Sequence, residues 1–126
     1  MSDHILFITT SRIQDGALEK VKEAARKSVA FIEANGPQLL AEVYIDEREL
    51  RFHSIQVHRD SASIVTHWQL ADPFMRDVMQ YITTSRVDIY GQPSEVVMAG
   101  MQRLSSQGAL LSVTPRFAGF SRLPGH

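Results

Sequence analysis

The hydrophobic pattern at the start of the chain predicts a strand followed by a helix. Residues 4–13 are rich in β-branched and aromatic side chains, which indicates a strand covered on both sides. Both alternating faces of this strand are apolar, with Ile5 and Phe7 on one face and Leu6 and Ile8 on the other. From residue 17 to residue 34 apolar positions recur at helical spacing, and Asn35-Gly36-Pro37 predicts the end of that helix.

The same kind of alternation continues through the rest of the chain. Asp60 or Ser61 can cap the second helix, and Asp72-Pro73 inside its apolar stripe predicts a break into two segments. Pro115 predicts that the last strand lies at a sheet edge or exchanges onto a partner, and the terminal Pro-Gly-His is expected to be loose. The expected elements are strands at 38–45, 49–59, 85–91 and 109–117, and helices at about 61–82 and 94–106.

The order of these elements predicts the fold class. A central βαββαβ run is typical of the ferredoxin-like α+β fold, an antiparallel sheet with two helices packed on one face. These helices leave the second apolar face of the first strand uncovered, so we expect a homodimer that packs sheet against sheet. The closing segment with Phe117 and Phe120 is expected to lie at that interface. The alternative is a monomer whose 94–106 helix folds beneath the sheet.

Composition narrows the functional classes. The chain of 126 residues is expected to form one domain, and its net charge of −1 without a basic cluster argues against nucleic-acid binding. The absence of cysteine excludes disulfide scaffolds, thiolate metal sites and cysteine nucleophiles, and it fits a reducing compartment. The first residues resemble neither a signal peptide nor a membrane span, so we expect a cytoplasmic protein without membrane partners.

Two neighbouring residues of the second helix are the first candidates for chemistry. His67 could act as a general base, because an unperturbed imidazole titrates near neutrality; the alternative is a helix-edge histidine bonded to backbone or to a partner subunit. Trp68, the single tryptophan, lies on the apolar stripe and fits a core position or a pocket wall. His53 and His58 are five residues apart on one strand and therefore point to opposite faces, so we expect no metal site.

The remaining candidates lie on expected strands. Tyr44 shares a strand face with Glu42, and a hydroxyl beside a carboxylate would suit a phenolic ligand; a solvated or interfacial face is the alternative. Arg86 alternates with apolar residues on the fourth expected strand and could hold an anionic substrate, or it could simply pair with Asp88. No phosphate-binding glycine loop and no serine-hydrolase elbow is present in the sequence.

Gln56, His58, Asp60, Ser63-Ile64 and His67 follow one another across the junction between the third expected strand and the second helix. In this pattern the junction resembles that of the antibiotic biosynthesis monooxygenase family, whose members are dimeric α+β barrels. A common pattern in that family is a glutamate, an aromatic residue, a small polar cap, then Ala-Leu and a histidine on the helix. The spacing matches throughout, although glutamine replaces the glutamate and a histidine replaces the aromatic residue. The matching positions here are Gln56, His58, Asp60, Ser63-Ile64 and His67. The resemblance covers roughly residues 4–90, and residues 94–120 extend a typical member.

This resemblance implies a function. Family members with known activity oxidise electron-rich phenols or quinols with molecular oxygen and use neither flavin nor metal, so no cofactor is expected. It implies a dry apolar pocket between sheet and helices, with His67 as proton acceptor and Trp68, Tyr44 and Phe7 as walls. His58 and Arg86 are further candidates for contact with a small aromatic or apolar ligand. The alternative is a non-catalytic barrel that binds such a ligand or acts as an interaction module.

Overall fold

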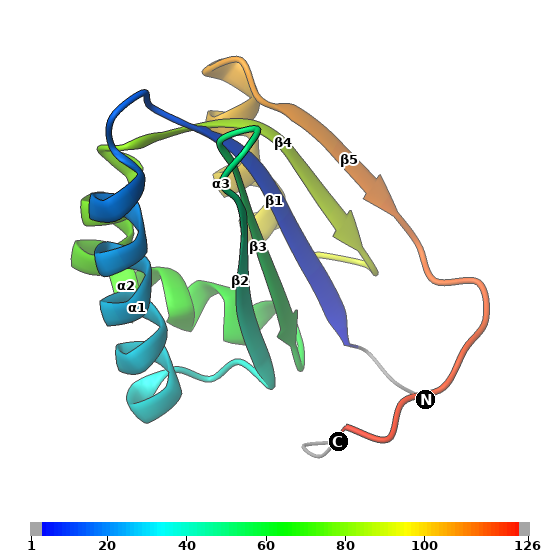
Figure 1. Cartoon of the computed structure of the whole chain (residues 1–126). Helices are drawn as coiled ribbons and strands as arrows, with labels where there is room; N and C mark the ends of the chain where they lie inside the picture. Colours follow the sequence, from blue (N-terminus) through cyan, green and yellow to red (C-terminus); the bar gives the residue numbers. More distant parts are fainter. Residues whose placement is uncertain (1–3, 124–126) are drawn as a thin grey trace.

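The computed structural model describes residues 4–123, which form a five-stranded sheet and three helices (Figure 1). The terminal Pro-Gly-His lies outside these residues. The strands are β1 (Ile5–Ile13), β2 (Leu40–Asp46), β3 (Arg51–His58), β4 (Ile82–Tyr90) and β5 (Leu110–Thr114). The helices are α1 (Leu18–Asn35), α2 (Ser61–Met79) and α3 (Glu95–Ser106).

The sheet confirms the ferredoxin-like fold and adds one strand to it. The strand order is β2-β3-β1-β4-β5, and the pairs among β1 to β4 are antiparallel. β5 pairs with β4 in parallel, because α3 carries the chain back to the starting end of the sheet. The last strand therefore lies at an edge, as expected, but it ends at Thr114, so Pro115 follows the strand and is not part of it.

A bulge in β4 determines which of its side chains face the helices. Thr10 of β1 pairs with Arg86, whereas the next residue, Ser11, pairs with Thr84, so Ser85 is the extra residue. The Ser85 hydroxyl donates a hydrogen bond to the carbonyl oxygen of Thr10 at 3.0 Å. Because of this insertion, apolar residues from both ends of β4 are buried on the inner face of the sheet.

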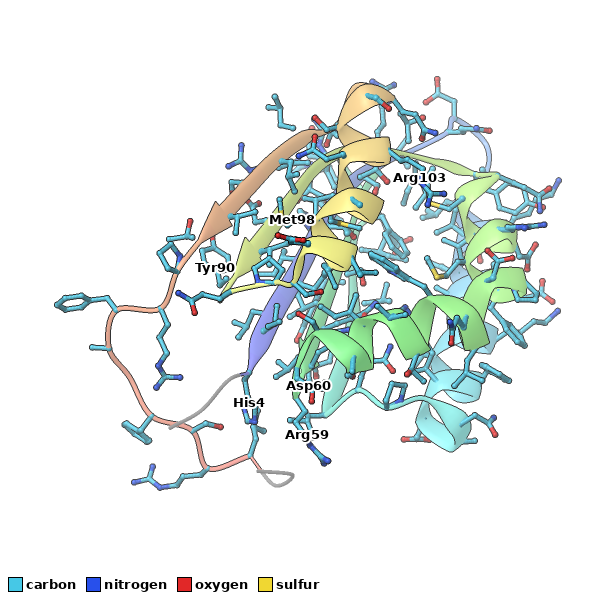
Figure 2. All side chains as sticks on the ribbon, turned by 180° about the vertical axis from the view of Figure 1, so that it is seen from behind. His4, Arg59, Asp60, Tyr90, Met98 and Arg103 are labelled. Atoms are coloured by element: carbon cyan, nitrogen blue, oxygen red, sulfur yellow. The ribbon has the colours of Figure 1, made fainter. Side chains whose placement is uncertain are left out.

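All three helices cover the same face of the sheet. Val97 and Met101 of α3 are buried in one hydrophobic cluster with Ile5, Ile64 and Ile89. Viewed from behind, α3 and α2 lie on the same side of the strands (Figure 2). The alternative in which the 94–106 helix folds beneath the sheet is therefore wrong, because its apolar face packs beside α2 and not on the opposite side.

The second helix differs from the prediction at two points. It is one helix that contains Pro73, and the carboxylate of Asp72 pairs with Arg76 at 2.9 Å instead of starting a new segment. Proline removes only one backbone donor, and Figure 2 shows a change of direction part-way along α2 where two helices were expected. The helix also ends at Met79, so Ile82 begins β4 and does not belong to the helical stripe.

The outer face of the sheet keeps exposed apolar side chains. Leu6 on the outer face of β1 is 38% exposed, and Phe117 and Phe120 beyond β5 are 101% and 76% exposed. The C-terminal segment leaves β5 and returns towards the beginning of β1 (Figure 1). The expected homodimer stays a prediction. Among residues 4–123 no helix combines the length and the apolar character needed to cross a bilayer.

Candidate functional site

A cavity of about 190 Å³ lies between the inner face of the sheet and helices α1 and α2. Its wall is predominantly apolar, and the polar side chains that line it supply hydroxyl groups, one amide and two imidazoles. Such a cavity, with few polar groups in a largely apolar wall, suits a small organic ligand. The main apolar side chains are Phe7, Val29, Phe52, Ile64, Trp68 and Met75.

The two imidazoles come from adjacent elements. His58 is the last residue of β3 and is 0% exposed, while His67 lies two turns into α2 and is 4% exposed. Asp60, labelled in Figure 2 at the start of α2, caps the helix by accepting a hydrogen bond from the Ser63 backbone N–H at 2.9 Å. This tight connection holds the two rings 5.9 Å apart, measured between centroids, at one end of the cavity.

A chain of hydrogen bonds links these imidazoles through two glutamine side chains. Ser63 Oγ lies 2.8 Å from His58 Nδ1, and His58 Nε2 lies 2.8 Å from Gln56 Oε1. Gln38 Nε2 donates to the same Gln56 oxygen at 3.3 Å and lies 2.7 Å from His67 Nδ1. These five side chains therefore form one connected network, which fixes both rings.

Both histidines are neutral at physiological pH. Burial lowers the pKa of His67 from 6.5 to about 4, because the charged imidazolium loses its hydration in this environment. The pKa of His58 is also lowered to about 4, first by burial and then by repulsion from His67, while Asp60 acts in the opposite direction. The cavity thus holds two uncharged imidazoles among apolar side chains.

Comparison with known proteins identifies the fold. No protein-family model matches the sequence, and no curated protein matches it. MupZ from Pseudomonas fluorescens is structurally similar, with a TM-score of 0.75, 13% identity and coverage of 94% of each chain. A protein from Nitrosomonas europaea assigned as an antibiotic biosynthesis monooxygenase has a TM-score of 0.63 at 14% identity, over 73% of this chain and 92% of its own. SnoaB from Streptomyces nogalater, a cofactor-independent oxygenase, has a TM-score of 0.61 at 11% identity, over 75% of this chain and 97% of its own.

The chain has the fold of the antibiotic biosynthesis monooxygenases. The expectation drawn from the strand-to-helix junction is confirmed at the level of fold. The structural match to MupZ covers 94% of this chain, so the matched region must include residues of α3 and β5. These two elements are therefore part of an arrangement that at least one protein with this fold shares.

Within this monooxygenase fold, four of the six predicted site residues lie together. Phe7, His58, His67 and Trp68 all line the cavity between sheet and helices. His67 differs from the alternative interpretation of a helix-edge histidine bonded to backbone. It is buried, and its ring is hydrogen-bonded to the side chain of Gln38.

Tyr44 lies elsewhere, and its placement in the cavity wall is wrong. In β2 its neighbours Val43 and Ile45 pack against the core, so strand alternation directs Tyr44 to the opposite face, where it is 51% exposed. The Tyr44 hydroxyl donates to Glu42 at 2.9 Å, and this hydrogen bond raises the pKa of the phenol. The two side chains share a strand face, as predicted, but that face is exposed.

Arg86 also lies outside the cavity, on the outer face of β4. Its Nε is 2.9 Å from both carboxylate oxygens of Asp88, so the alternative of an internal pair is confirmed. The guanidinium, followed by a hydrogen bond from the Ser112 hydroxyl, lowers the pKa of Asp88. This arrangement places no guanidinium in the cavity.

Sequence reasoning missed two residues that shape the site. Gln38 follows Gly36-Pro37 as an isolated polar residue, and no motif or periodicity distinguishes it. Gly100 of α3 looked equally isolated, yet a Cβ there would lie 2.6 Å from two ring atoms of Trp68. Only the packing reveals that Gly100 makes room for the indole.

His53 and His58 do face opposite sides of β3, and no three His, Asp or Glu side chains among the described residues are grouped as metal ligands.

Proposed function

We propose that the protein is a cofactor-independent monooxygenase that oxidises a small aromatic, phenolic or quinol-like compound with molecular oxygen. The observation that carries this proposal is a pair of buried, neutral imidazoles at one end of an apolar cavity. SnoaB, a cofactor-independent oxygenase, provides the supporting precedent for this fold. An electron-rich phenol or quinol that has lost its proton can transfer an electron to oxygen itself, so the protein needs only to bind, orient and desolvate it.

His67 would supply the polar contact with the substrate. Its ring borders the cavity, and a neutral imidazole can either accept a proton from a substrate hydroxyl or donate a hydrogen bond to a substrate oxygen. Phe7 and Trp68 would hold the aromatic rings of the substrate, because offset or edge contacts between aromatic groups are favourable. His58 would act through the hydrogen-bond network that ends at His67.

Oxygen consumption tests this proposal directly. Purified, metal-free protein would be mixed with a panel of hydroquinones and anthrones in an oxygen-electrode cell, beside His67→Ala and the control His53→Ala, which alters a histidine on the outer face of β3. We expect uptake well above the uncatalysed rate, reduced at least about tenfold in His67→Ala and unchanged in the control. Equal uptake by the wild type and His67→Ala would contradict a role for this residue.

A non-catalytic binding protein is the second candidate. The low pKa of His67 favours it, because an imidazole whose conjugate acid titrates near 4 is a weak proton acceptor for a phenol. Trp68 lines the cavity and is the single tryptophan of the chain, so its fluorescence reports binding. Compounds that change this fluorescence with saturation but consume no oxygen would favour the binding protein over the enzyme.

We also infer that two copies associate through the outer face of the sheet. Exposed Leu6, Tyr90 and Leu110 make this face apolar, and a second copy would cover it. Light scattering should give a dimer for the wild type and a monomer for Leu6→Glu. Val96→Glu, which alters an exposed apolar residue on α3, should remain dimeric. A wild type that is monomeric at micromolar concentration would contradict the inference.

A further inference from the structure

The side chain of Gln38 lies between His67 and Gln56 and is hydrogen-bonded to both. Its amide nitrogen has two hydrogens, and its two acceptors are Gln56 Oε1 at 3.3 Å and His67 Nδ1 at 2.7 Å. A neutral imidazole has one N–H and one lone pair. With an N–H directed at it, Nδ1 must present the lone pair, and the proton of His67 is then on Nε2.

The other end of the network is consistent with this assignment. Gln56 Oε1 also lies 2.8 Å from His58 Nε2, and because a carbonyl oxygen can only accept, His58 must donate from Nε2. His58 Nδ1 is then an acceptor, and the Ser63 hydroxyl, 2.8 Å away, can donate to it. With both rings neutral, every hydrogen bond of this network therefore has one donor and one acceptor.

The reversed network is less favourable. It would require the amide groups of both Gln38 and Gln56 to rotate by half a turn. His67 would then donate from Nδ1 to the Gln38 oxygen, and the Gln38 nitrogen would occupy the present position of Gln38 Oε1. That place is buried and offers no hydrogen-bond partner among the described residues. An unpaired carbonyl oxygen is tolerated there, whereas a buried NH₂ group without partners would cost more. The Gln38 oxygen lies against Gly36, where a Cβ would be only 2.6 Å away.

We propose that Gln38 is a positioning residue that makes the cavity a hydrogen-bond donor site, with the Nε2–H of His67 as the donor. The cavity would then select aromatic ligands that carry an acceptor oxygen, such as a ketone or quinone carbonyl or a phenolate. A ligand whose polar group is only a donor would face the imidazole N–H and lose a hydrogen bond on entering. This inference rests on the proposed function, because it names the ligand class for the same cavity, and of the two roles given there for His67 it selects hydrogen-bond donation to a substrate oxygen.

The tautomer can be measured without any ligand. Long-range ¹H–¹⁵N correlation spectra of histidine-labelled protein distinguish a protonated from an unprotonated ring nitrogen. We expect the Nε2–H form of His67 in the wild type and in the charge control Gln92→Glu, which alters an exposed loop residue. In Gln38→Glu a carboxylate can only accept, so His67 should be protonated at Nδ1. Gln38→Met, which removes the amide without adding charge, should give a mixture of both forms. The Nδ1–H form in the wild type would overturn the proposal.

Ligand selection can be measured with three bicyclic probes of similar size. Indan-1-one carries only an acceptor, indole carries only a donor, and indane carries neither, and calorimetry would give their dissociation constants. We expect indan-1-one to bind about tenfold more tightly than indole in the wild type, and the preference to shift towards indole in Gln38→Glu. Preference for indole in the wild type would overturn the inference alone. Failure of all three to bind would overturn the ligand-selection claim together with the proposed function, while the spectra still decide the tautomer.

Discussion

The two buried histidines should make the stability of this protein fall steeply in mild acid. In the folded protein the pKa of each is lowered from 6.5 to about 4, and burial is the main cause. The unfolded chain therefore binds protons at a higher pH than the folded chain. The free energy of unfolding is therefore highest above pH 6.5, and it decreases as the pH falls towards 4.

The size of the effect follows from the two pKa values. A pKa lowered from 6.5 to about 4 corresponds to about 3 kcal/mol per histidine once the pH is below both values. About 2 kcal/mol of this is lost between pH 7 and pH 5, so the two residues together cost about 4 kcal/mol over that interval. A typical domain is stabilised by roughly 5–15 kcal/mol, so this loss is a large part of the total.

Urea unfolding at pH 7 and pH 5, followed by the fluorescence of Trp68, measures this difference. His58→Asn and His67→Gln should each reduce the loss of unfolding free energy between the two pH values by about 2 kcal/mol. His53→Asn, on the outer face of β3, is the matched control for removal of an imidazole. If both variants lose as much stability as the wild type between pH 7 and pH 5, the histidines are not held neutral by burial, and the reasoning is refuted.

Three further predictions concern single contacts. Gly100→Ala should shift the emission of Trp68 and reduce the unfolding free energy by about 1–3 kcal/mol, because the new Cβ would lie 2.6 Å from the indole ring. The control Ala99→Ser, on the exposed side of α3, should change neither the emission nor the unfolding free energy. Asp60→Ala should reduce the unfolding free energy by about 1 kcal/mol through loss of the N-cap of α2, and no change in urea midpoint would contradict the capping role. Arg86→Ala should change the unfolding free energy by less than about 1 kcal/mol and leave the binding of the bicyclic probes unchanged. Weaker probe binding in this variant would show that Arg86 contributes to the ligand site.

The fold could be predicted because its pattern is local. The apolar faces of β1 and the helical spacing of α1 are set by residues close in sequence, and the turn residues mark where each element ends. The bulge at Ser85 could not be predicted, because it depends on how β4 pairs with β1 across the sheet. The continuity of α2 through Pro73 was missed for a related reason, since burial of residues on both sides of the proline, such as Ala71 and Val78, stabilises a helix that local propensity would interrupt.

Most of the site could be predicted because its residues belong to the recognisable junction between β3 and α2, and Phe7 lies on the strongly apolar strand β1. His58 and His67 lie at the end of β3 and on the next helix, and the resemblance of this junction to the monooxygenase family assigned both of them to one pocket. Tyr44 was misplaced because strand alternation gives two faces and does not say which one the helices cover. Gln38 was missed because its importance comes from a contact with His67, 29 residues away in sequence.

The two departures from the family junction compensate each other physically. A glutamate at position 56 would place a carboxylate about 2.8 Å from His58 Nε2, and that charge would favour the protonated imidazole. Gln56 offers the same oxygen without the charge, so a buried His58 can stay neutral. An aromatic residue at position 58 would in turn leave the Gln56 oxygen with one partner fewer and Ser63 Oγ without an acceptor. The glutamine and the histidine therefore form one neutral unit, and through Gln38 that unit controls the proton of His67.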